Sequence, residues 1–170
     1  MKKITLLLAF IGMITLQSCT VNEAQPTPID NDTISEVFEY SNVNFVPNSF
    51  SALLSFPHTI YSSDMVLVYR LSDIYQGEDV WKLQPETYYF NDGTLDFGYD
   101  FDFTKYDVNV FMHGFDLAGV SAEYRNNQVF RVVVIPAYFG KKSLGKIDTN
   151  DYNAVIKAYG IDDSKIIKIK

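Results

Sequence analysis

The sequence predicts a mainly β fold, an antiparallel β-sandwich of the kind found in immunoglobulin domains, with one short helix near the C-terminus. Three observations indicate it. About nine short segments rich in β-branched and aromatic residues are separated by turn residues. Apolar and acidic residues alternate from Leu95 to Phe103, and a helical period appears in the C-terminal tail. The chain has 170 residues, 47% of them apolar, which suits one globular domain, expected over residues 34–170.

The expected strands are bounded by Pro, Ser, Asn and Gly, residues that interrupt sheets and form turns. The clearest turn is Asn91-Asp92-Gly93, because an Asp-Gly step supplies the positive φ of a tight hairpin. Residues 129–135 are apolar on both strand faces apart from Arg131, so we expect this strand to be covered on both sides. The segments expected to form strands are residues 34–40, 50–56, 64–71, 80–84, 86–91, 95–103, 107–112, 129–135 and 164–169.

The run from Leu95 to Phe103 places apolar side chains on one strand face and acidic ones on the other. We expect the aromatic face to join the core. Carboxylates two residues apart on a strand are separated by about 6.6 Å, and Ca²⁺ prefers several oxygen ligands. The acidic face is therefore a candidate Ca²⁺ site, although no EF-hand spacing is present; its residues are Asp96, Asp100 and Asp102. The alternative interpretation is a solvated outer face that keeps an aromatic-rich sheet soluble.

The C-terminal tail is predicted to contain one amphipathic helix over about residues 149–159. Its apolar residues recur at helical spacing, Asp148 or Thr149 provides an N-cap, and Gly160 occupies the usual position after a helix end. The tail is basic: residues 141–170 carry 7 basic and 4 acidic side chains, whereas residues 20–140 carry 5 and 17. We expect the tail to dock on the acidic body, in preference to offering a basic patch to a partner or to anionic headgroups.

The N-terminus reads as a targeting segment. Lys2 and Lys3 precede an apolar run over residues 4–16, which is too short to span a bilayer and is typical of a secretory signal peptide. The run ends in Leu16-Gln17-Ser18-Cys19, which resembles the lipobox of bacterial lipoproteins. We therefore expect residues 1–18 to be removed and Cys19, the single cysteine, to be lipidated and to hold the protein at a membrane. Residues 19–33 are proline-containing and polar, and are predicted to form a tether of roughly 40 Å when stretched.

Charge and motif content exclude several functional classes. The formal net charge of −7 becomes −9 after removal of Lys2 and Lys3, which argues against a nucleic-acid binder. One cysteine and two histidines exclude a disulfide scaffold and a multi-Cys/His metal site. Residues 140–146 come close to a P-loop, but Ile147 stands where the motif needs Ser or Thr. No dinucleotide, redox-cysteine or serine-hydrolase motif is present, so we expect no organic cofactor.

Five aromatic side chains lie outside the clearest alternation, and three of them are candidates for ligand binding; the five are Tyr61, Tyr75, Trp81, Tyr124 and Tyr138. Sugar faces pack on aromatic rings, so exposed rings could form a glycan-binding platform. The candidates are Trp81, Tyr75 and Tyr138. Most other aromatic residues are assigned to the core by their alternation, and burial is the simpler alternative for these three as well.

Several segments resemble a family of small lipoproteins from Bacteroidota. The resemblance is carried by residues 64–71 (DMVLVYRL), by residues 79–82 (DVWK) with Gln84-Pro85 and Thr87, and by residues 129–136 (VFRVVVIP). It covers most of residues 34–160. Together with the lipobox, the resemblance implies an envelope lipoprotein, anchored to the outer membrane on its periplasmic or its surface face, and it assigns no specific activity.

The sequence as a whole favours a lipid-anchored, non-enzymatic module of the cell envelope that binds or supports another envelope protein or a glycan. One alternative is a Ca²⁺-dependent or glycan-binding accessory domain. Another is a small hydrolase, because Glu86 or Asp92 could form a carboxylate pair with the acidic residues of 96–102. A hydrolase would require several titratable groups to converge in one pocket.

Overall fold

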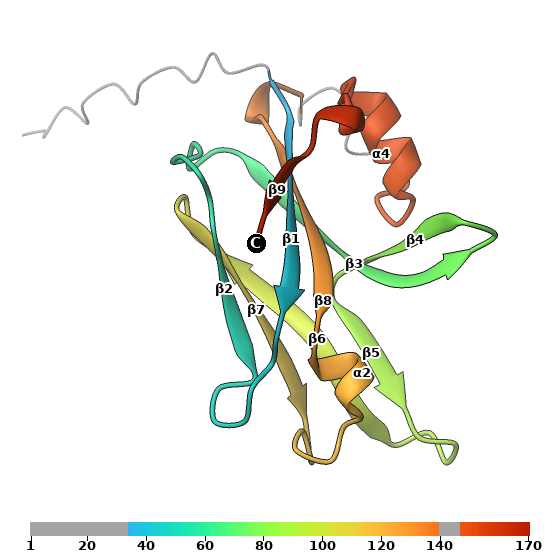
Figure 1. Cartoon of the computed structure of the whole chain (residues 1–170). Coiled ribbons are helices and arrows are strands. Elements are labelled where there is room, and N and C mark those ends of the chain that lie inside the picture. The colour runs from blue at the N-terminus through green and yellow to red at the C-terminus, as the bar shows by residue number, and fades with distance from the viewer. Residues whose placement is uncertain (1–33, 140–146) are drawn as a thin grey trace, which may run out of the picture.

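The computed structural model describes residues 34–139 and 147–170, which form two facing β-sheets (Figure 1). Sheet A has the strand order β4-β3-β8-β1-β9, and sheet B has the order β2-β7-β6-β5. The predicted mainly β sandwich is confirmed, while the closer likeness to immunoglobulin domains stays a prediction. The strands are β1 (Glu36–Val43), β2 (Ser51–Ser55), β3 (Met65–Tyr75), β4 (Glu78–Leu83), β5 (Glu86–Tyr89), β6 (Leu95–Phe103), β7 (Asp107–Gly114), β8 (Gln128–Ile135) and β9 (Ile167–Ile169).

The alternation along β6 orients this strand as the sequence predicts. Phe97 and Tyr99 are buried between the sheets, and Phe101 is partly buried there. Leu95 and Phe103, at the two strand ends, are exposed. The neighbouring strand β7 adds three fully or nearly fully buried side chains on the same face, Val108, Val110 and Met112. The inner faces of the two sheets therefore form the main core.

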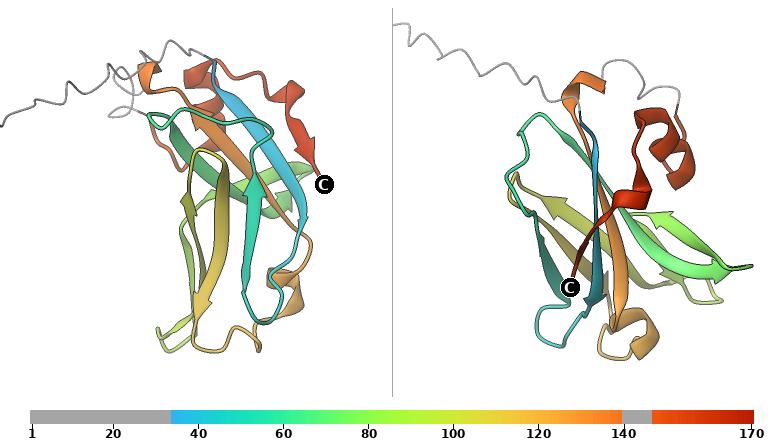
Figure 2. Two further views of the ribbon diagram at one scale, coloured as in Figure 1. Left: turned by 90° about the vertical axis from the view of Figure 1, so that its left-hand side faces the viewer. Right: turned by 45° about the horizontal axis from the view of Figure 1, so that its top comes forward.

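Strand β8 is covered on both sides, as its continuous apolar sequence predicts. Val132 and Val134 face the core between the sheets, while Val133 and Ile135 face outward. The outer side is covered by helix α4 (Tyr152–Tyr159), which packs its apolar residues on sheet A (Figure 2). The exception in the sequence, Arg131, also lies on this outer side, where its guanidinium carbon is 4.1 Å from the centre of the Trp81 ring.

Helix α4 begins later than the sequence predicts. Its N-cap is Asp151, whose side chain accepts a hydrogen bond from the Ala154 backbone N–H at 3.1 Å, so Asp148 and Thr149 precede the helix. Asp148 instead accepts hydrogen bonds from Asn150 in the turn before it. The predicted end is confirmed, because Gly160 adopts the left-handed conformation with φ of 64°.

The tail docks on the body, as its apolar faces and charge predict. After α4, a short 3-10 helix η1 (Asp163–Lys165) leads into β9, which pairs with β1. This pairing is parallel, so the sandwich is not wholly antiparallel. The Lys168 ammonium lies 3.1 Å from Glu39 on β1, and Arg131 contacts the same carboxylate at 3.0 Å. A basic tail strand is thus held by an acidic residue of the body.

A buried arginine links the two sheets. Arg70 on β3 is 4% exposed and reaches across the core to Glu86 on β5, with its Nε and Nη2 at 3.2 and 3.0 Å from Glu86 Oε2. Its Nη2 also donates to the Tyr88 hydroxyl at 2.6 Å, and its Nη1 donates to Gln128 Oε1 at 3.1 Å. Burial of a guanidinium is tolerated only when its donors and its charge are satisfied, and here they are. A short helix, α2 (Ala122–Arg125), precedes Gln128.

Candidate functional site

The two ends of the sandwich differ in what they carry. Ile34, the first described residue, lies at one end, and the β1–β2 loop, the β5–β6 hairpin and the β7–α2 loop lie together at the opposite end (Figure 1). These loops bear several large apolar side chains that are exposed to solvent. We call this surface the distal loop face; its apolar residues are Val46, Tyr89, Phe90, Leu95 and Phe115.

Strand register brings most of the distal loop face together. Tyr89 pairs with Leu95, and Phe97 pairs both with Tyr88 and with Gly114. Phe115 follows Gly114 directly, so these side chains occupy the ends of three neighbouring strands. Adjacent strands lie about 4.8 Å apart, which places the exposed rings within roughly 10 Å across the sheet. The exposed apolar side chains of the β5–β6 hairpin and of the β7–α2 loop therefore lie at the same end of sheet B.

Phe115 is held outward by the loop that carries it. Leu117 and Val120, later in the same loop, pack into the core. The Asp116 carboxylate accepts a hydrogen bond from the Gly119 backbone N–H at 3.1 Å, which fixes the turn between them. Gly114 has a φ of 154°, and a Cβ there would come within 2.5 Å of the Asp96 carbonyl oxygen. The fully exposed Phe115 ring is thus presented by an ordered loop.

The β1–β2 loop is tied to the same end of the molecule. The Phe45 backbone N–H donates to the Arg125 carbonyl of α2 at 2.8 Å, and the Asn127 N–H donates to the Asn44 side chain at 2.9 Å. These bonds connect the loop that bears Val46 to the segment that follows Phe115 in the chain. The β1–β2 loop is therefore tied to the α2 segment.

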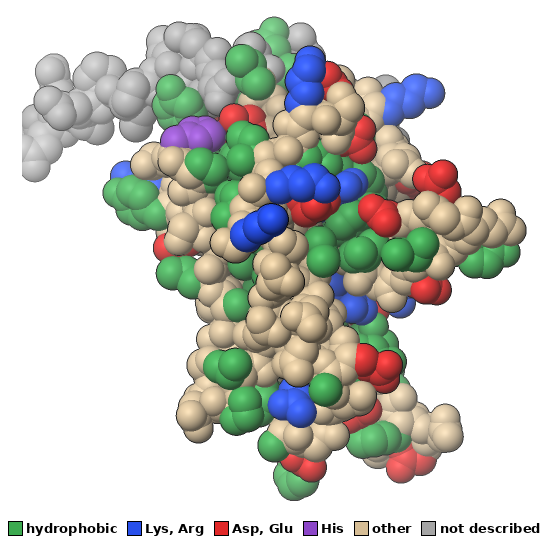
Figure 3. All heavy atoms as spheres, viewed as in Figure 1, with side chains coloured by type: hydrophobic (Ala, Val, Ile, Leu, Met, Phe, Trp, Pro, Cys, Tyr) green, Lys and Arg blue, Asp and Glu red, His purple; other side chains and the backbone are tan. Residues whose placement is uncertain are grey.

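The charge of the distal loop face is mainly negative. Asp92, Asp116 and Glu123 are exposed there. The guanidinium of the nearby Arg125 donates a hydrogen bond to the Val120 carbonyl at 2.7 Å. The Thr94 hydroxyl and backbone N–H donate to Asp92, which holds the pKa of that carboxyl below its usual value. Figure 3 shows hydrophobic and acidic side chains interspersed over this end.

The three aromatic residues predicted to bind a ligand do not form one platform. Trp81 is half-buried: the Arg131 guanidinium lies over its ring and the Tyr152 ring packs beside it, so Trp81 is part of the contact between β4 and α4. Tyr75 is exposed at the tip of the β3–β4 hairpin, and Tyr138 is exposed shortly after the end of β8. That end of β8 pairs with the start of β3, and β3 extends roughly 30 Å at about 3.3 Å per residue. Tyr75 and Tyr138 therefore lie at opposite ends of sheet A.

The acidic residues of β6 point away from the core, as predicted. Asp100 accepts a hydrogen bond from the neighbouring Phe101 N–H at 2.7 Å, and Asp102 lies 3.5 Å from the Asn109 side-chain amide. Within residues 34–139 and 147–170, no three Asp, Glu, His or Cys side chains gather closely enough to hold a metal ion. Asp96, Asp100 and Asp102 thus lie on one strand face, and the Ca²⁺ site stays a prediction.

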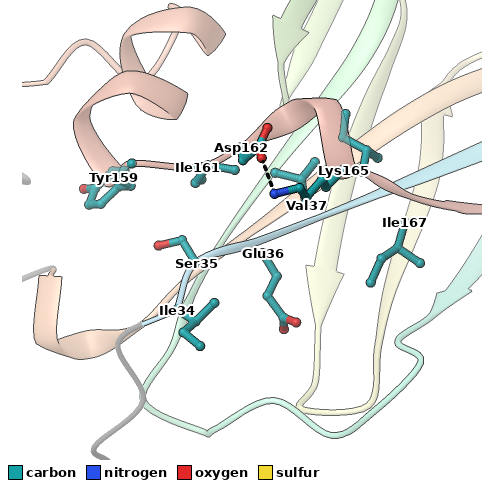
Figure 4. A pocket seen from close by; sticks show the side chains of 11 residues that line it. Ile34, Ser35, Glu36, Val37, Tyr159, Ile161, Asp162, Lys165 and Ile167 are labelled. Atoms are coloured by element: carbon teal, nitrogen blue, oxygen red, sulfur yellow. Dashed lines mark ion pairs between the residues drawn. The ribbon is translucent and has the colours of Figure 1, made fainter.

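A pocket of about 410 Å³ lies at the end of the molecule that carries Ile34, between the start of β1 and the segment that follows α4 (Figure 4). Its rim carries an ion pair between Asp162 and Lys165 at 2.8 Å. The Ser35 hydroxyl points to one side of β1, and Glu36 points to the other, where it lies 2.9 Å from His58. Ser35 is therefore not aligned with the Glu36–His58 pair as a hydrolase nucleophile would be.

The sequence did not identify the distal loop face. Tyr89 and Phe90 fall within the strand predicted over residues 86–91, and Phe115 belongs to none of the predicted elements. A usable signal was the position of large aromatic residues beside turn residues, in Phe90-Asn91-Asp92-Gly93 and in Gly114-Phe115-Asp116. Cys19 and the near P-loop of residues 140–146 lie outside the described residues.

Among the described residues, the helices are all too short or too polar to cross a membrane. Comparison with family models gives no match, and comparisons with curated proteins and with solved structures give none either. Function must therefore be inferred from the geometry of the chain itself.

Proposed function

We propose that the chain is a lipid-anchored protein of the cell envelope that acts as a non-enzymatic binding module. Lipidated Cys19 holds it in the outer membrane, residues 19–33 tether the domain, and the distal loop face binds another envelope protein. The observation that carries this proposal is the number of large exposed apolar side chains on the loops at the end of the sandwich opposite Ile34.

The composition of the distal loop face favours protein binding. Aromatic side chains supply large contact areas at little entropic cost and are enriched among the residues that dominate interface energies. Contiguous exposed apolar patches on soluble domains commonly mark interaction sites. Phe90 and Phe115 would serve as the anchors, and the surrounding acids favour a partner whose surface is positively charged.

The anchor and the binding face fit one arrangement. The tether joins the domain at Ile34, so a membrane anchor at Cys19 would leave the opposite end pointing away from the lipid surface. A stretched tether of roughly 40 Å would add reach and orientational freedom. An acidic distal face also makes adsorption to an anionic membrane unfavourable, which leaves that end available to a protein partner.

The anchor is tested by replacing Cys19 with Ser in the full-length chain. We expect radiolabelled palmitate to enter the native protein and to be absent from the C19S variant, which should leave the membrane fraction, because no thiol remains to accept the lipid. A matched control, Ser18→Ala, keeps a small residue before the cysteine and should be labelled normally. Lipid incorporation into C19S, or membrane attachment that survives carbonate washing, would contradict the anchor.

A further inference from the structure

Strand β2 is a free edge of sheet B. It pairs with β7 on one side and has no strand on the other among the described residues. Edge strands in soluble proteins are usually blunted by charged residues, proline or bulges, because unpaired strand edges invite pairing. Residues 50–56 (FSALLSF) contain none of the charged residues or prolines that would prevent it, and the β2–β7 register is continuous.

The backbone groups that face this edge can be assigned by alternation. The Met112 N–H donates to the Phe50 carbonyl and the Phe56 N–H donates to the Tyr106 carbonyl, both at 2.8 Å. Residues 50, 52, 54 and 56 therefore direct their backbone groups toward β7, and Ser51, Leu53 and Ser55 direct theirs to the free edge.

Two side chains reach part of this row of free-edge groups. The Tyr40 hydroxyl donates to the Ser55 carbonyl at 2.8 Å, and the Ser49 hydroxyl lies 3.4 Å from the Ser51 carbonyl. In the described part of the chain, no hydrogen bond is formed by the Leu53 N–H and C=O, and the Leu53 side chain is 62% exposed. Leu53 is thus the centre of an unpaired strand edge.

A groove of about 440 Å³ runs beside this edge, between β2 and the part of β1 that continues beyond its pairing with β9. In the left view of Figure 2, β2 lies between β7 and β1. Val43, Ala52, Leu53 and Ile169 contribute apolar side chains to the groove, and Lys170 is the one charged side chain among the described residues that line it. The groove gives a chain laid along β2 a largely uncharged surface to pack against.

We propose that the β2 edge binds an extended segment of a partner protein as an added strand of sheet B. The unpaired groups are main-chain donors and acceptors repeating every second residue, about 6.8 Å apart, a spacing that another strand matches. The bound segment is uncharged where it faces the groove. A carboxylate or ammonium placed there would lose hydration, and the groove offers few charged or polar side chains to replace it. It presents an apolar residue beside Leu53, whose exposed side chain the contact covers.

A second copy of the chain is a poorer occupant than a partner segment. Two β2 strands paired antiparallel around a two-fold axis would point their Ile34 ends in opposite directions. One of the two distal loop faces would then point toward the membrane, which conflicts with the arrangement proposed above; this argument rests on the proposed function. Self-association through β2 is therefore an outcome that would overturn the proposal.

The test uses the full-length chain in detergent micelles and a short peptide of alternating threonine and valine as the model strand. We expect the peptide to slow amide hydrogen exchange at Ser51, Leu53 and Ser55 by roughly five- to tenfold, the effect of gaining one hydrogen bond each. The amides of Ala52 and Leu54, already bonded to β7, should not change. A peptide that is N-methylated at every residue cannot donate from either edge and should have no effect.

Two variants separate backbone from side-chain recognition. Leu53→Pro removes the free-edge donor without removing a bond to β7, and edge strands accept proline at such positions. It should abolish the exchange effect at Ser51 and Ser55, whereas Leu53→Ala should keep the alternating pattern with weaker binding. Three results would overturn the proposal. They are uniform or absent protection of the β2 amides from exchange in the native protein, protection that survives in L53P, and a doubled particle mass that L53P abolishes. Unchanged behaviour of a variant altered at Phe90 and Phe115 would show that this edge acts separately from the distal loop face.

Discussion

Replacing Glu86 by alanine is expected to destabilise the folded domain by about 3–5 kcal/mol, because it leaves the buried Arg70 guanidinium without its carboxylate. Both side chains are nearly inaccessible to solvent, so solvent would compensate the guanidinium poorly. Chemical denaturation of E86A measures the loss directly. Lys82, which contacts the other Glu86 oxygen at 2.9 Å from the exposed side, provides the matched control: Lys82→Ala should cost at most about 1 kcal/mol.

The same pair predicts how stability depends on pH. Burial alone would raise the pKa of Glu86, but hydrogen bonding with Lys82 and Tyr88 and the charge of Arg70 hold the pKa below its usual value of 4.5. The folded protein then binds fewer protons than the unfolded chain in acid, so this stabilisation is present above about pH 5 and is lost as the pH falls below 4.5. The slope of stability against pH should be shallower in E86A. An unchanged slope, together with a loss below 1 kcal/mol, would contradict the role assigned to the pair.

Replacing Phe90 and Phe115 by serine is expected to weaken the association with the envelope partner by roughly 30-fold or more. Both rings are exposed and make no core contact, so the F90S/F115S domain should keep its melting temperature while losing its anchors. The measurement is native-gel migration of the chain after extraction in mild detergent. The native protein should migrate as a complex and the variant as the free chain.

The control for that experiment removes equally exposed apolar side chains from another surface. Ile74 and Tyr75 lie at the tip of the β3–β4 hairpin, away from the distal loop face. The I74S/Y75S variant should migrate as the native complex does. Equal loss of the complex in both variants would indicate that general hydrophobicity, and not the distal loop face, holds the partner.

Local pattern predicted most of the fold because each strand carries its own signal. The alternation over β6 assigns Phe97 and Tyr99 to the core without knowledge of the other strands, and the Asp-Gly turn marks the hairpin before it. The helix start was placed too early because several residues before Tyr152 could cap it, and the choice of Asp151 depends on the position of α4 on sheet A. The parallel pairing of β9 with β1 depends likewise on where the tail docks.

The candidate site was largely beyond sequence reasoning because it depends on which loops meet. Phe90 and Phe115 are separated in the chain, and the β5-β6-β7 register brings them to the same end of sheet B. Trp81 illustrates the opposite case: it reads as a binding residue, but Arg131 and Tyr152 cover its ring once α4 docks. The partners of Arg70 were unforeseeable for the same reason, since Glu86 and Gln128 come from different sheets.

The most direct test of a domain tethered at one end and binding at the other is site-specific photocrosslinking in intact cells. A photoreactive residue is placed in the full-length chain at position 115, in the distal loop face, or at position 61, an exposed tyrosine of the β2–β3 loop, which lies at the same end of the sandwich as the start of β1. We predict a discrete protein adduct from position 115 that F90S reduces, and no such adduct from position 61. An adduct from position 61 alone, or equal adducts from both positions, would contradict binding through the distal loop face.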